Sequence, residues 1–193
     1  MTKERLNAVT DGVFAVIMTL LALDLPQPKQ PLTIGSFADV NVRLLAYLLS
    51  FLVLVRLWIY INNGWQFVQR INNRVIWLNF ISLFILTLFP YATTMVAENF
   101  NNKIAQTIYG VLIFLTNALN AYIYTELGKL HQDNPTTLQQ FDVRMKTIRF
   151  DLVLKAAGIL LTLTIWTPAA FFAVMLSMVS PTLVKWVKFA IRK

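Results

Sequence analysis

Six apolar runs, each close to the length of a membrane-crossing helix, limit the fold of this 193-residue sequence more than any other feature. A transmembrane helix needs about 20 mostly apolar residues. The runs cover residues 6–25, 42–61, 75–96, 104–126, 150–166 and 169–187. They leave room only for short connections. The sequence therefore predicts an all-α integral membrane protein, in which residues 1–193 form one domain of six transmembrane helices.

Composition excludes several classes of protein. Hydrophobic residues make up 57% of the chain and charged residues 13%, whereas soluble domains average about 45–50% and about 25%. The chain has no cysteine and one histidine, His131, which argues against disulfides, thiolate sites and a histidine-based metal centre. No clustered histidines or paired carboxylates face a shared site. We therefore expect no enzyme, no metal and no bound cofactor.

The basic residues predict the orientation in the membrane. Of the 17 lysines and arginines, 12 fall on the side of the N-terminus if six spans alternate, and three on the opposite side. The other two, Arg56 and Lys155, lie within spans. Because cytoplasmic loops carry an excess of lysine and arginine, both termini are predicted to be cytoplasmic. The net charge of +8 is spread over short gaps between apolar runs, which does not fit a nucleic-acid-binding surface.

The first span combines an apolar stripe with a carboxylate. At 100° per residue, one stripe contains Val9, Gly12, Val16, Leu20 and Leu23, with Thr19 on its edge. Asp11 points nearly the opposite way. A carboxylate buried in a helix bundle must be paired, hydrogen-bonded or protonated, and Arg5 is a candidate partner. On periodicity alone, such a stripe ordinarily packs in a core or faces lipid.

This segment resembles the first-helix signature of the transmembrane protein 175 family, which comprises lysosomal and bacterial potassium channels with the motif Arg-x-x-x-Phe-Ser-Asp. The matching residues are Arg5, Thr10, Asp11, Gly12, Val13-Phe14-Ala15, Thr19-Leu20-Leu21 and Asp24. Trp77-Leu78-Asn79 and Leu88-Phe89-Pro90, followed by Thr93 and Thr94, resemble the family's third helix. Two departures are that Val9-Thr10 replaces Phe-Ser, and that Asn62 and Asn63 stand where the second helix often has histidines.

The resemblance implies a homotetramer whose first helices line a central pore without a carbonyl selectivity filter. Counted from Asp11, the implied constricting residues are Val16, Leu20 and Leu23. Thr19 takes the position of the pore threonine, and Arg5, Thr10, Asp11 and Gly12 form the motif network. No segment resembles Thr-Val-Gly-Tyr-Gly, and a narrow apolar ring blocks ions by expelling water.

The expected function is a potassium-permeable cation channel with potassium as the permeant ion. The short single-repeat form suggests a bacterial inner membrane. Two alternatives remain: a secondary transporter or proton-coupled carrier, and a non-conducting membrane scaffold. Against a carrier, the glycines and prolines sit mostly at span ends, whereas transporters usually break helices at mid-membrane.

Other polar residues and the later segments give further expectations. Lys155 lies four residues after Asp151, so we expect an ion pair with snorkelling toward the interface. Arg56 either pairs with Asp11 or Asp24 or is structural, and His131 is expected to be solvated in a surface connection. We expect an amphipathic interfacial helix over 139–149, and a tight turn at 166–168 joining the last two spans as an antiparallel hairpin.

Overall fold

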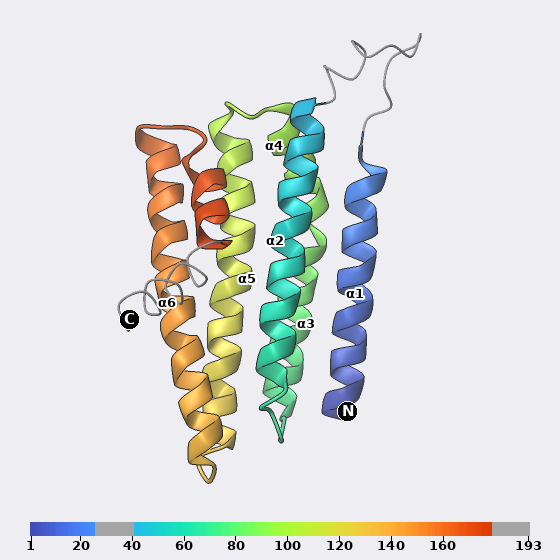
Figure 1. Cartoon of the computed structure of the whole chain (residues 1–193), viewed down its shortest axis with the longest axis vertical. Coiled ribbons are helices and arrows are strands. Elements are labelled where there is room, and N and C mark those ends of the chain that lie inside the picture. Colours follow the sequence, from blue (N-terminus) through green and yellow to red (C-terminus); the bar gives the residue numbers. More distant parts are fainter. Residues whose placement is uncertain (26–40, 179–193) are drawn as a thin grey trace, which may run out of the picture.

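The computed structural model describes residues 1–25 and 41–178, and within them the prediction of an all-α fold is confirmed (Figure 1). The labelled helices are α1 Lys3–Leu23, α2 Asn41–Trp65, α3 Asn73–Thr87, α4 Phe89–Glu98, α5 Lys103–Leu130 and α6 Pro135–Thr164. A shorter apolar helix, Ala169–Met178, follows. Residues 26–40 and the end of the predicted sixth span lie outside the described residues.

Four helical segments in the described part of the chain are long and apolar enough to cross a membrane. They are Lys3–Leu23, Arg43–Trp65, Asn73–Glu98 and Lys103–Leu130. The third joins α3 and α4 through Leu88, just before Pro90 at the start of α4. Proline has no backbone N–H and so marks a helix start more easily than a helix interior. The six-span topology stays a prediction for α6 and the helix after it.

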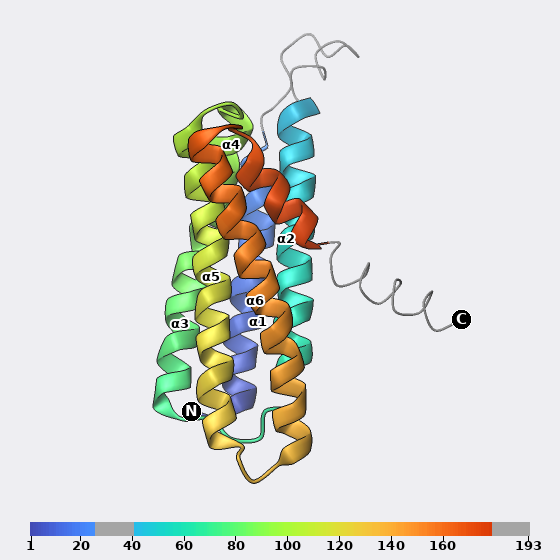
Figure 2. The same ribbon diagram turned by 90° about the vertical axis from the view of Figure 1, so that its left-hand side faces the viewer.

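The predicted interfacial helix and fifth span are one continuous element. α6 runs for 30 residues without a break, so the boundary expected near residue 150 is absent. Its first half carries most of its charged side chains, which explains the expectation of an interfacial segment. After α6, the chain turns back through residues 165–168, where the backbone N–H of Ala170 donates to Thr162 Oγ1 at 2.8 Å. Figures 1 and 2 show Ala169–Met178 returning beside α6, as expected for the hairpin.

Asparagine and threonine side chains start the helices. Asn72, Asn102 and Asn134 accept hydrogen bonds from backbone N–H groups two or three residues on, at 2.8–3.3 Å. Thr2 does the same for α1 at 3.4 Å. These residue types are the preferred N-caps because they satisfy donors that the first helical turn leaves unpaired. Short polar connections thus set where the apolar helices begin.

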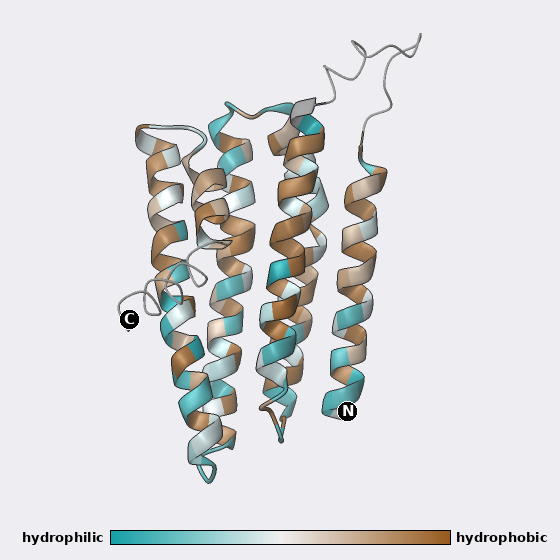
Figure 3. Ribbon diagram, in the orientation of Figure 1, coloured by the Kyte–Doolittle hydropathy of each residue, from teal (hydrophilic) through white to brown (hydrophobic). Residues whose placement is uncertain are grey.

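α1 lies at one edge of the bundle. It contacts α2, α3 and α4, whereas α5 packs against α3, α4 and α6. Figures 1 and 2 show α1 and α6 on opposite sides of the helix layer. In Figure 3, apolar residues cover most of the helix length and polar residues gather at the helix ends, most densely at the end that holds the N-terminus. Among the described helices, α1 therefore has neighbours on one side only.

His131 is buried, so the prediction that it is solvated is wrong. It follows α5 and is 1% exposed. Its Nε2 accepts from the backbone N–H groups of Gln69 and Arg70 at 2.9 and 3.1 Å. Nδ1 therefore carries the proton and donates to the Leu127 carbonyl at 2.8 Å. The side chain ties the connection between α2 and α3 to the end of α5.

Gly158 allows α6 to approach the helix Ala169–Met178 closely. A Cβ at this position would overlap that of Ala173 and lie 3.1 Å from the Ala169 carbonyl oxygen. We expect Gly158→Ala to destabilise the chain by about 1–3 kcal/mol, because the hairpin would have to open. Gly128→Ala is the matched control, since a Cβ there meets only Leu138 at 4.0 Å. Thermal unfolding in detergent compares the two, and equal melting temperatures would contradict the packing described.

The candidate pore face of the first helix

The buried face of α1 anchors this helix to the bundle. Its buried residues recur every three or four positions, as expected for one side of a helix. They are Leu6, Thr10, Phe14, Ile17 and Leu21. All but Thr10 are apolar and at most 2% exposed. This regular spacing fixes how α1 is rotated, and it determines which residues point away from the chain.

The predicted pore residues lie on the opposite, unpartnered side of α1. Val16 is 57% exposed, Leu20 40% and Leu23 77%. A Cβ added at Gly12 would meet no other atom within 4 Å. The stripe is thus exposed, and it forms no part of the core that residues 1–25 and 41–178 build.

Thr19 also lies on the open side of α1. Its hydroxyl donates to the Val16 carbonyl at 2.8 Å. That bond uses the hydrogen and leaves the oxygen lone pairs free to accept. The exposed side of the helix therefore combines branched aliphatic groups with one hydroxyl oxygen able to face a cation.

Asp11 is held by a tryptophan of α2. Trp58 Nε1 donates to Asp11 Oδ1 at 2.7 Å. Among the described residues, no ion pair joins the Arg5 side chain to Asp11, so the candidate pairing of these two residues is not formed. The sequence motifs do not single out Trp58. Its indole N–H is a donor without an acceptor function, and this suits it to a lone carboxylate.

Two further motif residues join α1 to the third span. Asn79 Nδ2 donates to Thr10 Oγ1 at 3.0 Å, and Thr10 in turn donates to the Leu6 carbonyl at 2.9 Å. At the other end, Thr94 Oγ1 donates to Asp24 Oδ2 at 3.3 Å. The hydroxyl and amide that the sequence motifs singled out are therefore hydrogen-bonded to each other in the fold.

The link between Asp11 and Trp58 can be measured. Asp11→Ala and Trp58→Phe should each destabilise the chain, and the two effects should not add, because each substitution breaks the same hydrogen bond. A charge-assisted bond at an exposed position gives an expected coupling of about 1 kcal/mol. Unfolding of both single variants and the double variant provides this value. Strictly additive effects would contradict a direct bond.

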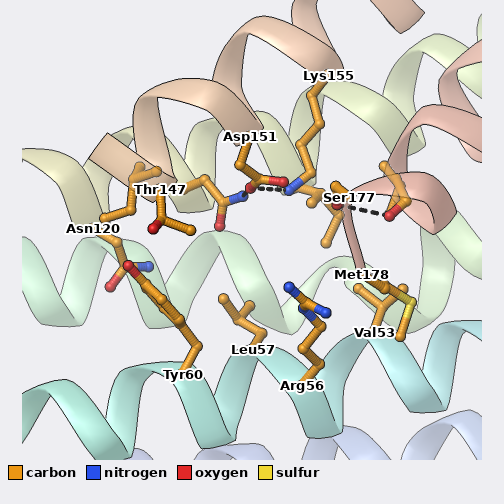
Figure 4. Close-up of a pocket in the computed structure, with 14 residues that line it drawn as sticks. Val53, Arg56, Leu57, Tyr60, Asn120, Thr147, Asp151, Lys155, Ser177 and Met178 are labelled. Carbon is orange, nitrogen blue, oxygen red and sulfur yellow. Dashed lines mark hydrogen bonds and ion pairs between the residues drawn. The ribbon is translucent and has the colours of Figure 1, made fainter. Parts of the chain in front are cut away.

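A second polar site lies between α2, α5 and α6. Asp151 pairs with Lys155, as predicted, and also accepts from Asn117. Lys155 is 4% exposed, so its predicted snorkelling to the interface is wrong. Arg56 points into this site rather than toward α1 (Figure 4). The suggested pairing of Arg56 with Asp11 or Asp24 is therefore wrong too, because helix rotation turns it to the other side of α2.

Comparisons with known proteins agree with the motif. A family model described as the endosomal/lysosomal potassium channel TMEM175 matches residues 5–90. A potassium channel of Chryseobacterium sp. is 32% identical over 116 residues, which are 60% of this chain and 60% of that protein. A potassium channel of Streptomyces collinus is 29% identical over 116 residues, 56% of each chain. The match thus spans only about 60% of the length of these relatives.

The fold as a whole has a solved counterpart. The crystal structure of a lysosomal potassium-selective channel TMEM175 homolog from Chamaesiphon minutus aligns with a TM-score of 0.72 and 23% sequence identity, and covers 98% of this chain and 97% of that one. Fold and sequence define a multi-pass helical membrane protein. Over residues 5–90 the chain is similar to the family of the endosomal/lysosomal potassium channel TMEM175, and over about 60% of its length it is similar to bacterial potassium channels.

Proposed function

We propose that this protein is a potassium-permeable cation channel in which four copies of α1 surround a central pore. The matched bacterial relatives are named potassium channels. The observation that carries the proposal is the exposed aliphatic stripe Val16, Leu20 and Leu23 on a helix whose other face is fixed by the family motif contacts. The described helices of a single chain include one such helix, so a pore requires several copies.

In this proposal, rings of Val16, Leu20 and Leu23 form the constriction. A narrow apolar ring expels water and blocks ions, and a wider ring lets a partly dehydrated ion cross. Potassium gives up hydration water more readily than sodium, so the ring favours potassium without coordinating it. Because the ring offers no replacement ligands, selectivity should be modest.

Polar groups next to the rings would lower the barrier. The Thr19 oxygens of four chains would offset part of the dehydration cost. Asp24, which lies beyond Leu23 at the end of α1, would raise the local cation concentration near that mouth. The excess of lysine and arginine on the side of the N-terminus supports a cytoplasmic N-terminus. With six spans, the C-terminus would be cytoplasmic too. Asp24 would then lie at the outer mouth of a bacterial inner-membrane channel.

A flux assay in liposomes tests the function. Purified protein should collapse a potassium gradient rapidly and passively when valinomycin is absent, with a smaller sodium flux. A carrier would instead saturate and couple potassium to a second ion, and a scaffold would conduct neither ion. Saturable, coupled transport or no flux from correctly inserted protein would contradict the proposed channel.

A further inference from the structure

A polar cavity lies between α2, α5, α6 and Ala169–Met178, on the side of α2 away from α1. Its volume is about 60 Å³, and about 10–15 Å³ suffices for one water molecule. Arg56 of α2 points into it opposite Asp151 and Lys155 of α6 (Figure 4). The other polar side chains that line it are Tyr60, Asn117, Asn120, Thr147 and Ser177.

The charges in this cavity do not balance. In the part of the chain that the structure describes, two cationic side chains, Arg56 and Lys155, face one carboxylate, Asp151, which leaves a net charge of +1. Asp151 already accepts from both Lys155 and Asn117 through Oδ2. Among the described residues, the Arg56 guanidinium forms no hydrogen bond or ion pair within 4 Å, although Asp151 and Lys155 lie within electrostatic reach.

The remaining polar groups do not supply the missing negative charge. The Tyr60 hydroxyl donates to the Arg144 carbonyl at 3.2 Å, and no further carboxylate of the described residues lines the cavity. Val53, Leu57, Ile113 and Val174 form its apolar wall. Arg56 also lies within a candidate membrane span, where charged side chains normally pair with a counter-charge. Unused N–H donors therefore surround a space that is large enough for a small ion.

We infer that this cavity binds one small monovalent anion, with chloride as the physiological representative. Such an anion would accept hydrogen bonds from the Arg56 guanidinium and from the N–H groups of Lys155 that Asp151 does not use. One monovalent anion brings the net charge of the cavity to zero, whereas a dianion would reverse its sign. Arginine is the side chain best suited to hold an anion in a partly buried site, because its charge is fixed and it presents five donors.

Chloride dependence of the melting temperature tests the inference independently of ion flux. The full chain in detergent is unfolded thermally in sodium chloride and in sodium gluconate at equal ionic strength. Chloride should raise the melting temperature by about 2–4 °C, because it binds the folded state. Arg56→Gln should abolish this difference. Arg149→Gln, which removes a positive charge from the exposed side of α6, should retain it and is the matched control.

A second measurement uses the unaltered chain, so it stays decisive if Arg56→Gln fails to fold. Crystals grown in sodium bromide should show an anomalous difference peak in the cavity beside the Arg56 guanidinium. The peak should disappear when bromide is exchanged for gluconate. Equal melting temperatures in the two salts, a chloride shift that Arg56→Gln retains, or a cavity without bromide density would each overturn the inference.

Discussion

Replacing Leu20 with asparagine should raise potassium conductance and reduce the preference for potassium over sodium. In the proposed pore, the Leu20 ring is part of the apolar barrier, and four amide groups would hydrate the constriction. An increase of about tenfold is expected, equivalent to a barrier lower by about 1.4 kcal/mol. Single-channel recording, or flux in liposomes at matched protein content, provides the conductance and the potassium-to-sodium ratio. Val16→Asn should act in the same direction.

The control for this experiment is Leu160→Asn. Leu160 lies on α6 and is 63% exposed, so it is an exposed leucine like Leu20 but lies on a different helix from the proposed pore stripe. Leu160→Asn should leave conductance and selectivity unchanged. If Leu20→Asn and Val16→Asn also left both properties unchanged, these residues would not line the permeation path.

Replacing Asp151 with alanine should cause the largest loss of stability among the substitutions considered. The change removes the one carboxylate that faces Lys155 and Arg56 within residues 1–25 and 41–178. Leaving a buried cation without its partner typically costs about 3–5 kcal/mol. For a chain of this size, this corresponds to a melting temperature lower by roughly 10 °C. Asp142→Ala, at an exposed position on the same helix, should have little effect.

The double variant Asp151→Ala/Lys155→Met identifies the cause. If the loss of stability comes from an unpaired buried ammonium group, removing Lys155 as well should recover part of it. Thermal unfolding of the single and double variants in the same detergent provides the comparison. A double variant less stable than Asp151→Ala would show that packing, and not charge pairing, dominates at this site.

The positions of the helices and the rotation of α1 about its own axis can be predicted from the sequence pattern within each segment. Apolar runs determine where α2, α3 and α5 lie, and asparagine caps determine where α3, α5 and α6 begin. The spacing of Phe14, Ile17 and Leu21 determines which side of α1 is buried. Because these three residues face the bundle, Val16, Leu20 and Leu23 lie on the exposed side of the helix. The hydrogen bond between Thr10 and Asn79 joins two segments that the motifs had singled out separately.

The hydrogen-bond partners of the polar side chains cannot be predicted from nearby sequence, because they depend on how the helices pack. Nothing in periodicity distinguishes Trp58 from Arg5 as the partner of Asp11, because the choice depends on how α2 is rotated against α1. The same rotation turns Arg56 toward α6. His131 lies in a polar stretch of sequence, yet two backbone N–H groups of a distant connection need its Nε2 as their acceptor. Such contacts arise only when the helices are packed.

Cysteine cross-linking tests most directly whether the exposed residues Val16, Leu20 and Leu23 of several copies face one central pore. The chain has no cysteine, so Leu20→Cys introduces a single thiol. In native membranes, mild oxidation should convert this variant into covalent dimers, while Leu160→Cys on α6 should stay monomeric. A charged thiol reagent should also block potassium flux through Leu20→Cys before oxidation. A Leu20→Cys protein that stays monomeric and keeps its flux after thiol modification would contradict the proposed pore.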